Sequence, residues 1–203
     1  MKKNPTNRPP CTPRHPFGYR AFTLLELLVV ISIIAALAAI ATPVTGRVIH
    51  QARKAECNQQ VTNLITAIKG YQLEYGHIPI KTGGAAEGTV LTTDNGDGLE
   101  LMKCLIGEDN ATFGNPKQVA FYEPRYTDSR KGGWDSTTGS EGLYDPWGNP
   151  FYILLDHNFD KSIIPTPLDA GNTAPVRKDV LILSRGHKND PAEVDDDLFS
   201  WKK

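Results

Sequence analysis

The sequence predicts an α+β fold in which one long amino-terminal helix packs on a small antiparallel sheet. Three observations carry this prediction. Residues 22–44 form an almost unbroken apolar run. From Val48 to Tyr75, apolar residues recur at intervals of three and four, which is typical of a helix with one buried face. Short β-branched and aromatic runs bounded by turn residues follow, as strands do.

The first 21 residues differ in charge from the rest of the chain. The 203-residue chain has a net charge of −1, of which residues 1–21 contribute +5 and the remainder −6. The length suits one globular domain with an appendage. The acidic remainder lacks the clustered Lys and Arg of a nucleic-acid-binding face, so we expect no nucleic-acid partner.

Residues 1–21 are predicted to be a basic leader peptide, and residues 22–44 the transmembrane part of the long helix. The apolar run of 23 residues exceeds the roughly 20 helical residues that cross a bilayer. Basic residues before the run and few after it keep the leader in the cytoplasm and place the carboxyl-terminal body outside it. The sequence therefore predicts a single-pass membrane protein.

An ordinary secretory signal is the alternative for this segment. Ala39-Ile40-Ala41 supplies the small residues of a signal-peptidase site. Against it stand Pro43, directly after that site, and the carboxylate of Glu26 inside the apolar run. An ionised group in hydrocarbon costs a few kcal/mol or more, so Glu26 indicates a role for its charge.

The run FTLLELLVVI at residues 22–31 resembles the signal shared by type IV pilins and type II secretion pseudopilins. The resemblance implies that a prepilin peptidase cleaves between Ala21 and Phe22 and methylates the new amino group of Phe22. Glu26 then becomes the fifth residue and Pro43 the twenty-second, where the family carries a glutamate and often a proline. The family usually has glycine before the cut, and Ala21 departs from that pattern.

The resemblance also implies how the subunit assembles. The amine of Phe22 in one copy would meet Glu26 of its neighbour, and opposite charges attract strongly in a low-dielectric setting. The implied partners are further copies of the chain, the prepilin peptidase, the inner membrane, and a secretion or pilus assembly platform. The alternative is that Glu26 only reaches the lipid headgroups. The implied location is the inner membrane, with the amino terminus cytoplasmic and the head periplasmic.

Residues 45–76 are predicted to be the amphipathic part of the long helix, and residues 77–203 the periplasmic α+β head. Gly76 and Pro79 are the expected stop signals of the helix. The face predicted to be buried comprises Val48, Ala52, Ala55, Val61, Leu64, Ile65, Ile68, Tyr71 and Tyr75. The elements predicted for the head are a loop at 82–98, a short helix at 99–107, strands at 117–122, 151–155 and 180–183, an exposed loop at 129–142 in which Trp134 is either core or surface, and a polar connection at 157–178.

A second resemblance lies at residues 145–150. The segment DPWGNP is similar to the one that precedes a strand in the major (G-type) pseudopilins of type II secretion systems. Prolines stiffen this turn and Trp147 supplies an apolar anchor, so its role is architectural. This resemblance favours a pseudopilus subunit over the alternatives, which are a type IV pilin or minor pilin (adhesion, motility, DNA uptake) and a membrane-anchored periplasmic binding module.

The carboxyl-terminal segment from Ser184 to Trp201 is similar to the end of the same pseudopilins, where a loop binds calcium. The resemblance implies Ser184, Asp195, Asp196 and Asp197 as metal ligands, and Ca²⁺ as the one cofactor to consider. Lys188 stands where the family often has an aspartate. The alternative is a solvated acidic turn with Trp201 as its apolar plug.

Catalytic motifs are missing from the sequence. The histidines form no HExxH pair and no serine lies in a GxSxG context, so we expect a structural protein and not an enzyme. Cys57 and Cys104 could pair outside the cytoplasm or remain thiols.

Overall fold

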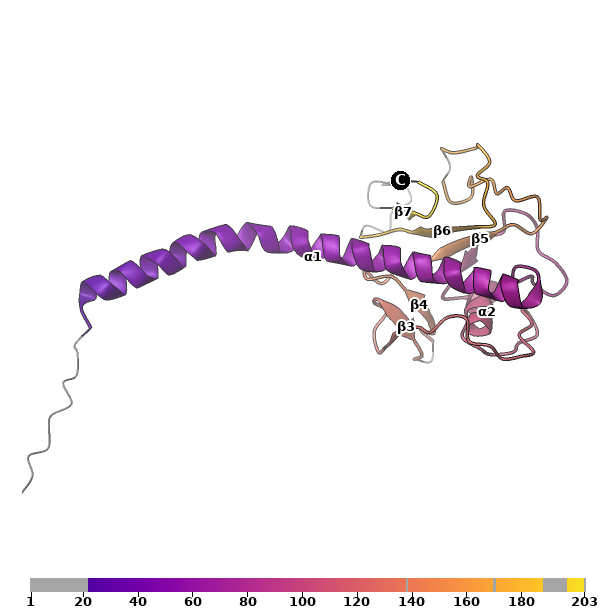
Figure 1. The fold of residues 1–203 in the computed structure, drawn as a ribbon, viewed down its shortest axis with the longest axis horizontal. Coiled ribbons are helices and arrows are strands. Elements are labelled where there is room, and N and C mark those ends of the chain that lie inside the picture. Colours follow the sequence, from indigo (N-terminus) through magenta and orange to yellow (C-terminus); the bar gives the residue numbers. More distant parts are fainter. Residues whose placement is uncertain (1–21, 138, 170, 188–196, 203) are drawn as a thin grey trace, which may run out of the picture. The chain divides into compact units, whose positions relative to one another are not determined.

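The computed structural model describes residues 22–137, 139–169, 171–187 and 197–202. The chain divides into two units, residues 1–45 and residues 46–203, and each is described here by itself. Helix α1 (Leu24–Tyr75) contributes to both (Figure 1). The leader with Ala21, and the acidic residues Asp195 and Asp196, lie outside the described residues.

Helix α1 is one continuous element at the level of the backbone. Its backbone remains helical through Pro43 and Gly46. It ends at Tyr75, as predicted, because Gly76 adopts a φ of 80° and its N–H binds the carbonyl of Gln72 at 2.8 Å. Among the described residues, no helix has both the length and the apolarity of a membrane span, so the structure does not confirm the predicted span.

The later part of α1 supplies one wall of the head core. Its buried residues are spaced by three or four along one face: Cys57, Val61, Leu64, Ala67, Ile68 and Tyr71. The prediction was wrong for the turns before Cys57. Val48 is 54% exposed and Ala52 and Ala55 are also exposed, because the head core begins only at Cys57.

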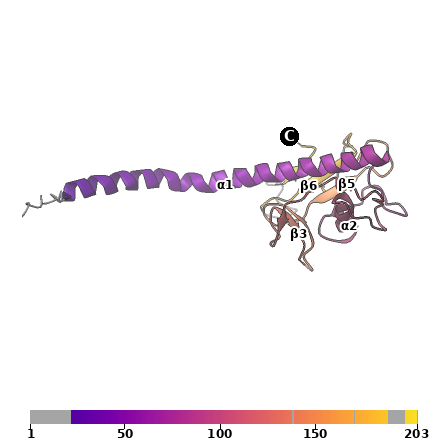
Figure 2. The same ribbon diagram turned by 60° about the horizontal axis from the view of Figure 1, so that its bottom comes forward.

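Four antiparallel strands form the main sheet of the head. They are β1 (Leu91–Thr92), β5 (Tyr152–Leu155), β6 (Val180–Ser184) and β7 (Leu198–Phe199), in the order β1-β5-β6-β7. The two central strands confirm the predicted strands at 151–155 and 180–183, in the register Ile153 opposite Ile182. The later part of α1 runs along β5 and β6 in Figure 2.

Both faces of this sheet are buried. Side chains alternate along a strand. Ile153 and Ile182 therefore share a core with α1, while Leu154 and Leu181 face the other side. The connection at 157–178 covers that second face with Ile163, Leu168 and the partly buried Val176, which share this cluster with Leu183 of β6. The polar connection predicted from the sequence is thus also part of a core.

A second, smaller sheet was not predicted. Its strands are β2 (Tyr126–Thr127), β3 (Gly133–Asp135) and β4 (Gly142–Tyr144), with β2 parallel to β3 and β3 antiparallel to β4. Trp134, on β3, is 2% exposed and belongs to the core. Thr93 joins the two sheets, since its hydroxyl donates to the carbonyl of Leu143 at 2.6 Å and accepts from the N–H of Phe151 at 2.9 Å.

The short helix was predicted correctly, whereas the strand placed after it was not. Helix α2 (Gly96–Leu105) begins three residues before the predicted segment 99–107 and ends two residues before its end. The segment 117–122 forms no strand, because the N–H groups of Phe121 and Tyr122 both bind the carbonyl of Leu105 at the end of α2. These bonds satisfy a helix-terminal carbonyl that has no partner inside the helix.

Candidate functional site

A reciprocal pair of hydrogen bonds starts α1. The carboxylate of Glu26 accepts from the backbone N–H of Thr23 at 3.0 Å and from its hydroxyl at 2.9 Å. The hydroxyl of Thr23 in turn accepts from the N–H of Glu26 at 3.2 Å. This is a capping box, which satisfies donors that the first turn of a helix leaves unpaired. Glu26 therefore has a local partner in its own chain, and its role in assembly stays a prediction.

The first unit presents an uncovered apolar surface. Every side chain from Phe22 to Ala39 is exposed, including all the large apolar ones. Glu26 is the sole charged residue among them, and Ser32 directs its hydroxyl to the carbonyl of Val29 at 2.8 Å. A helix that is apolar on all sides requires an apolar environment on all sides.

Asp145 organises the DPWGNP turn. One oxygen of its carboxylate, Oδ1, accepts from the N–H groups of Trp147, Gly148 and Asn149 at 2.8–2.9 Å. The other, Oδ2, accepts from the hydroxyl of Ser184 at 2.7 Å. Burial raises the pKa of Asp145, and these hydrogen bonds act in the opposite direction.

The same turn is tied to the end of β6. Asn149 donates its side-chain N–H to the carbonyl of Gly186 at 2.6 Å, and Ser184 accepts from the N–H of Gly186 at 3.2 Å. Gly148 has a φ of 101°, and a Cβ there would lie 2.6 Å from the carbonyl oxygen of Arg130. The architectural role predicted for the turn is therefore matched by its contacts, and Ser184 serves the turn.

Asp197 is the one residue of the predicted acidic set 195–197 that the structure describes. Its side chain is buried, and Oδ2 accepts from Arg185 at 3.0 Å. Burial raises the pKa of Asp197, and Arg185 lowers it. Trp201 stacks edge-on against Phe199, with 4.9 Å between ring centroids. Among the described residues, no three His, Cys, Asp or Glu side chains form a group suited to a metal ion.

Both cysteines of the head are free and buried. They do not pair. Burial raises the pKa of Cys57 and of Cys104 to about 12. A thiol that is protonated at neutral pH and shielded from solvent is chemically inert, so these residues serve as core side chains.

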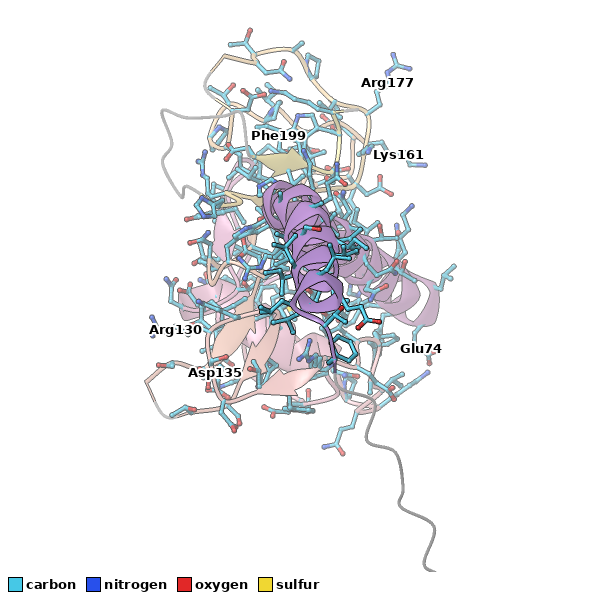
Figure 3. The ribbon with its side chains drawn as sticks, turned by 90° about the vertical axis from the view of Figure 1, so that its left-hand side faces the viewer. Glu74, Arg130, Asp135, Lys161, Arg177 and Phe199 are labelled. Atoms are coloured by element: carbon cyan, nitrogen blue, oxygen red, sulfur yellow. The ribbon has the colours of Figure 1, made fainter. Side chains whose placement is uncertain are left out.

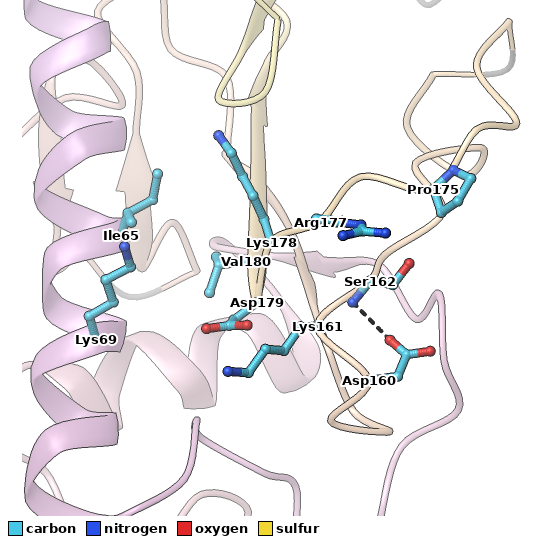
Figure 4. A pocket seen from close by; sticks show the side chains of 10 residues that line it. All are labelled: Ile65, Lys69, Asp160, Lys161, Ser162, Pro175, Arg177, Lys178, Asp179 and Val180. Carbon is cyan, nitrogen blue, oxygen red and sulfur yellow. Dashed lines mark hydrogen bonds between the residues drawn. The ribbon is translucent and has the colours of Figure 1, made fainter.

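A basic pocket of about 780 Å³ lies between α1 and the segment that precedes β6 (Figure 4). Lys69, Lys161 and Arg177 make no side-chain ion pair within the described part of the chain, while the amine of Lys178 donates to the carbonyl of Ser200 at 2.6 Å. Asp160 and Asp179 also line it. Figure 3 places Lys161 and Arg177 at the opposite end of the head from Arg130 and Asp135.

The sequence interpretation missed two features of the site. The spacing Thr23-x-x-Glu26 is itself the signature of a capping box and could have been found. The bond between Asp145 and Ser184 joins residues 39 positions apart, and nothing local in the sequence indicates it.

Comparison with known proteins identifies the first part of the chain. Residues 17–42 match the prokaryotic N-terminal methylation motif, a range that includes the predicted cleavage position, Phe22 and Glu26. No curated protein and no solved structure matches the chain. The chain therefore carries a type IV pilin-like prepilin signal over residues 17–42.

Proposed function

We propose that this protein is a structural subunit of a type II secretion pseudopilus, processed before Phe22 and polymerised for protein export. The observation that carries the proposal is the uncovered, mostly apolar surface of residues 22–39, in which Glu26 is the one charged residue and which lies within the matched methylation motif. A fibre of copies supplies both the apolar environment for that surface and a cation for Glu26. The protein acts through assembly and carries out no catalysis.

The proposed topology is a single pass of the inner membrane by residues 22–44, with a cytoplasmic leader and a periplasmic head. Five Lys and Arg residues before the apolar run support that orientation. The partners are further copies of the chain, the prepilin peptidase and an inner-membrane assembly platform.

The choice of a pseudopilin over a type IV pilin rests on the DPWGNP turn. Its buried Asp145 fixes the entry into β5 and holds the end of β6. Calcium at Asp195, Asp196 and Asp197 remains part of the proposal. In the described part of that segment, Arg185 already supplies one positive charge to Asp197.

The first experiment is intact mass and amino-terminal sequencing of the protein from its native membrane. A chain that begins at methylated Phe22 supports the proposal. A chain that begins at Thr42 contradicts it, because only an ordinary secretory signal is cut there. The matched variant Ala21→Gly restores the residue usual before the cut, and its processing should be as fast as or faster than that of the natural chain.

A second experiment separates the two kinds of fibre. Deletion of the gene should retain the exported proteins inside the cells while leaving surface pili and twitching intact. Loss of surface pili with normal export would instead assign the chain to a type IV pilus.

A further inference from the structure

The loop that follows β5 carries an oxygen-bearing side chain at every second position: Asp156, Asn158, Asp160 and Ser162. In calcium loops of the EF-hand type, positions 1, 3 and 5 supply side-chain oxygens and position 7 a main-chain carbonyl, while position 6 is a glycine that permits a sharp turn. Counted from Asp156, position 6 is Lys161, which adopts a positive φ of 59°.

The backbone of this loop is folded around its own carboxylates. The N–H of Lys161 donates to Oδ2 of Asp156 at 2.7 Å. The N–H of Asp160 donates to Oδ1 of Asn158 at 3.0 Å, and that of Ser162 to Oδ1 of Asp160 at 2.8 Å, the dashed bond in Figure 4. Each of these oxygens keeps a second lone pair, so a cation can be bound without loss of the hydrogen bonds.

An unpaired buried oxygen points independently to a ligand. Asp156 is 2% exposed, and its Oδ1 has no hydrogen-bond partner among the described residues. A buried carboxylate oxygen without a partner is destabilising, and a bound cation would remove that cost.

We propose that the loop 156–162 binds one Ca²⁺ ion through the side-chain oxygens of Asp156, Asn158 and Asp160 and the main-chain carbonyl of Ser162. Water completes the coordination. This set contains only two carboxylates, together with an amide and a main-chain carbonyl. It is therefore not one of the groups of three His, Cys, Asp or Glu side chains considered above. The site is separate from the acidic segment 195–197 and does not depend on the function proposed above.

The affinity follows from the ligands. Position 12 of the loop is Pro167, so the bidentate glutamate of tight EF-hand sites is missing. Two carboxylates give a weak site, and we expect a Kd of about 0.1 to 1 mM, the range of extracellular calcium modules. Such a site fills where calcium is at millimolar levels and empties where it is not.

The test is the stoichiometry of Ca²⁺ binding to the full chain in detergent micelles, measured by equilibrium dialysis with radioactive calcium. Asp160→Asn alters an exposed side chain and should leave the fold intact, whereas Asp156→Asn removes the buried charge. Each of these two variants should bind one Ca²⁺ equivalent fewer per chain than the natural chain, or bind it with a Kd at least tenfold higher. Asp128→Asn, at another exposed aspartate, and the double variant Asp195→Asn, Asp196→Asn should retain that equivalent.

Thermal unfolding gives a second readout that needs no tracer. In the background of the double variant Asp195→Asn, Asp196→Asn, calcium at about 10 mM should raise the Tm by roughly 3 °C or more, and adding Asp160→Asn should abolish that rise. The proposal is overturned if the natural chain binds no Ca²⁺ at that concentration, or if Asp160→Asn keeps full binding. Loss of the equivalent only in the Asp195 and Asp196 double variant would also overturn it.

Discussion

Two stretches of the same helix differ in what covers them. Residues 24–39 of α1 expose every side chain, and Leu24 is 87% exposed, whereas Leu64 in the later part of α1 is fully buried. Both stretches are apolar and helical, so helix propensity does not separate them. The later stretch finds its cover in β5 and β6 of the same chain, while the earlier one must find it in lipid or in other copies.

Two acidic residues, Glu26 at the start of α1 and Asp145 in the head, differ in the same way. Glu26 is satisfied by Thr23, three residues away, and needs no tertiary structure. Asp145 is satisfied partly by Ser184, which a different strand supplies. A helix start can therefore form alone, but the head forms only as a whole.

The sharpest contrast should be in the chemistry of the head cysteines. In a Cys11→Ser background at pH 8, we expect Cys57 and Cys104 to react with a thiol reagent about a thousandfold more slowly than in the denatured chain, because a pKa near 12 leaves almost no thiolate. Time-resolved absorbance of the released chromophore measures the rate. Reaction as fast as in denaturant would show that water reaches this core.

The Asp145 turn should account for the next largest effect. Asp145→Ala leaves the N–H groups of Trp147 and Asn149 and the hydroxyl of Ser184 without their acceptor, so the free energy of unfolding should fall by about 3 to 5 kcal/mol. Urea unfolding followed by tryptophan fluorescence measures it. Asp128→Ala, at an exposed site, should change it by less than about 0.5 kcal/mol. Cleavage before Phe22 should be unaffected by Asp145→Ala. A cleavage defect would contradict the view that the amino-terminal unit is processed independently of the folding of the head.

Two glycines offer a matched pair. Gly148→Ala should cost about 2 to 3 kcal/mol, because φ is 101° and the new Cβ would meet the carbonyl of Arg130. Gly46→Ala lies within α1 with nothing near its Cβ, and should stabilise the chain by up to about 1 kcal/mol. The two Tm shifts should have opposite signs. Equal shifts would contradict the contacts described for the turn.

The smallest effect on stability should come from the residue that matters most for assembly. Glu26→Ala removes the cap of α1 and should leave the free energy of unfolding of the head unchanged. Fibre yield should fall at least tenfold, which corresponds to a loss of about 1.4 kcal/mol or more for each contact between Glu26 and a neighbouring amine. Sheared-fibre recovery and chemical cross-linking measure it. Glu74→Ala, which breaks an exposed ion pair with Lys117 in the head, is the control and should leave fibre yield unchanged.

Local patterns predicted the parts of the fold whose causes are local. Gly76 and Pro79 marked the end of α1, and the β-branched runs at 151–155 and 180–183 marked the two central strands. The Glu26 position was recognised from the signal sequence, and the comparison at residues 17–42 confirms that signal.

Long-range contacts explain what could not be predicted. Strands β2 and β3 are only two and three residues long, too short to produce an alternating pattern. The segment 117–122 has the composition of a strand, but its N–H groups bind the end of α2. Arg185 was not recognised as the partner of Asp197, because the two lie 12 residues apart in the sequence. Arg185 directly follows β6 and Asp197 directly precedes β7.

The bonds of the Asp145 turn determine how much of the chain must be synthesised before the head can fold. Ser184 emerges from the ribosome 39 residues after Asp145, and β7, which pairs with β6, emerges later still. Distant pairings of this kind slow folding and make it cooperative. The head therefore folds in one late step, after its last strand has been made, and a chain truncated before β7 should be degraded rather than accumulate as a partly folded subunit.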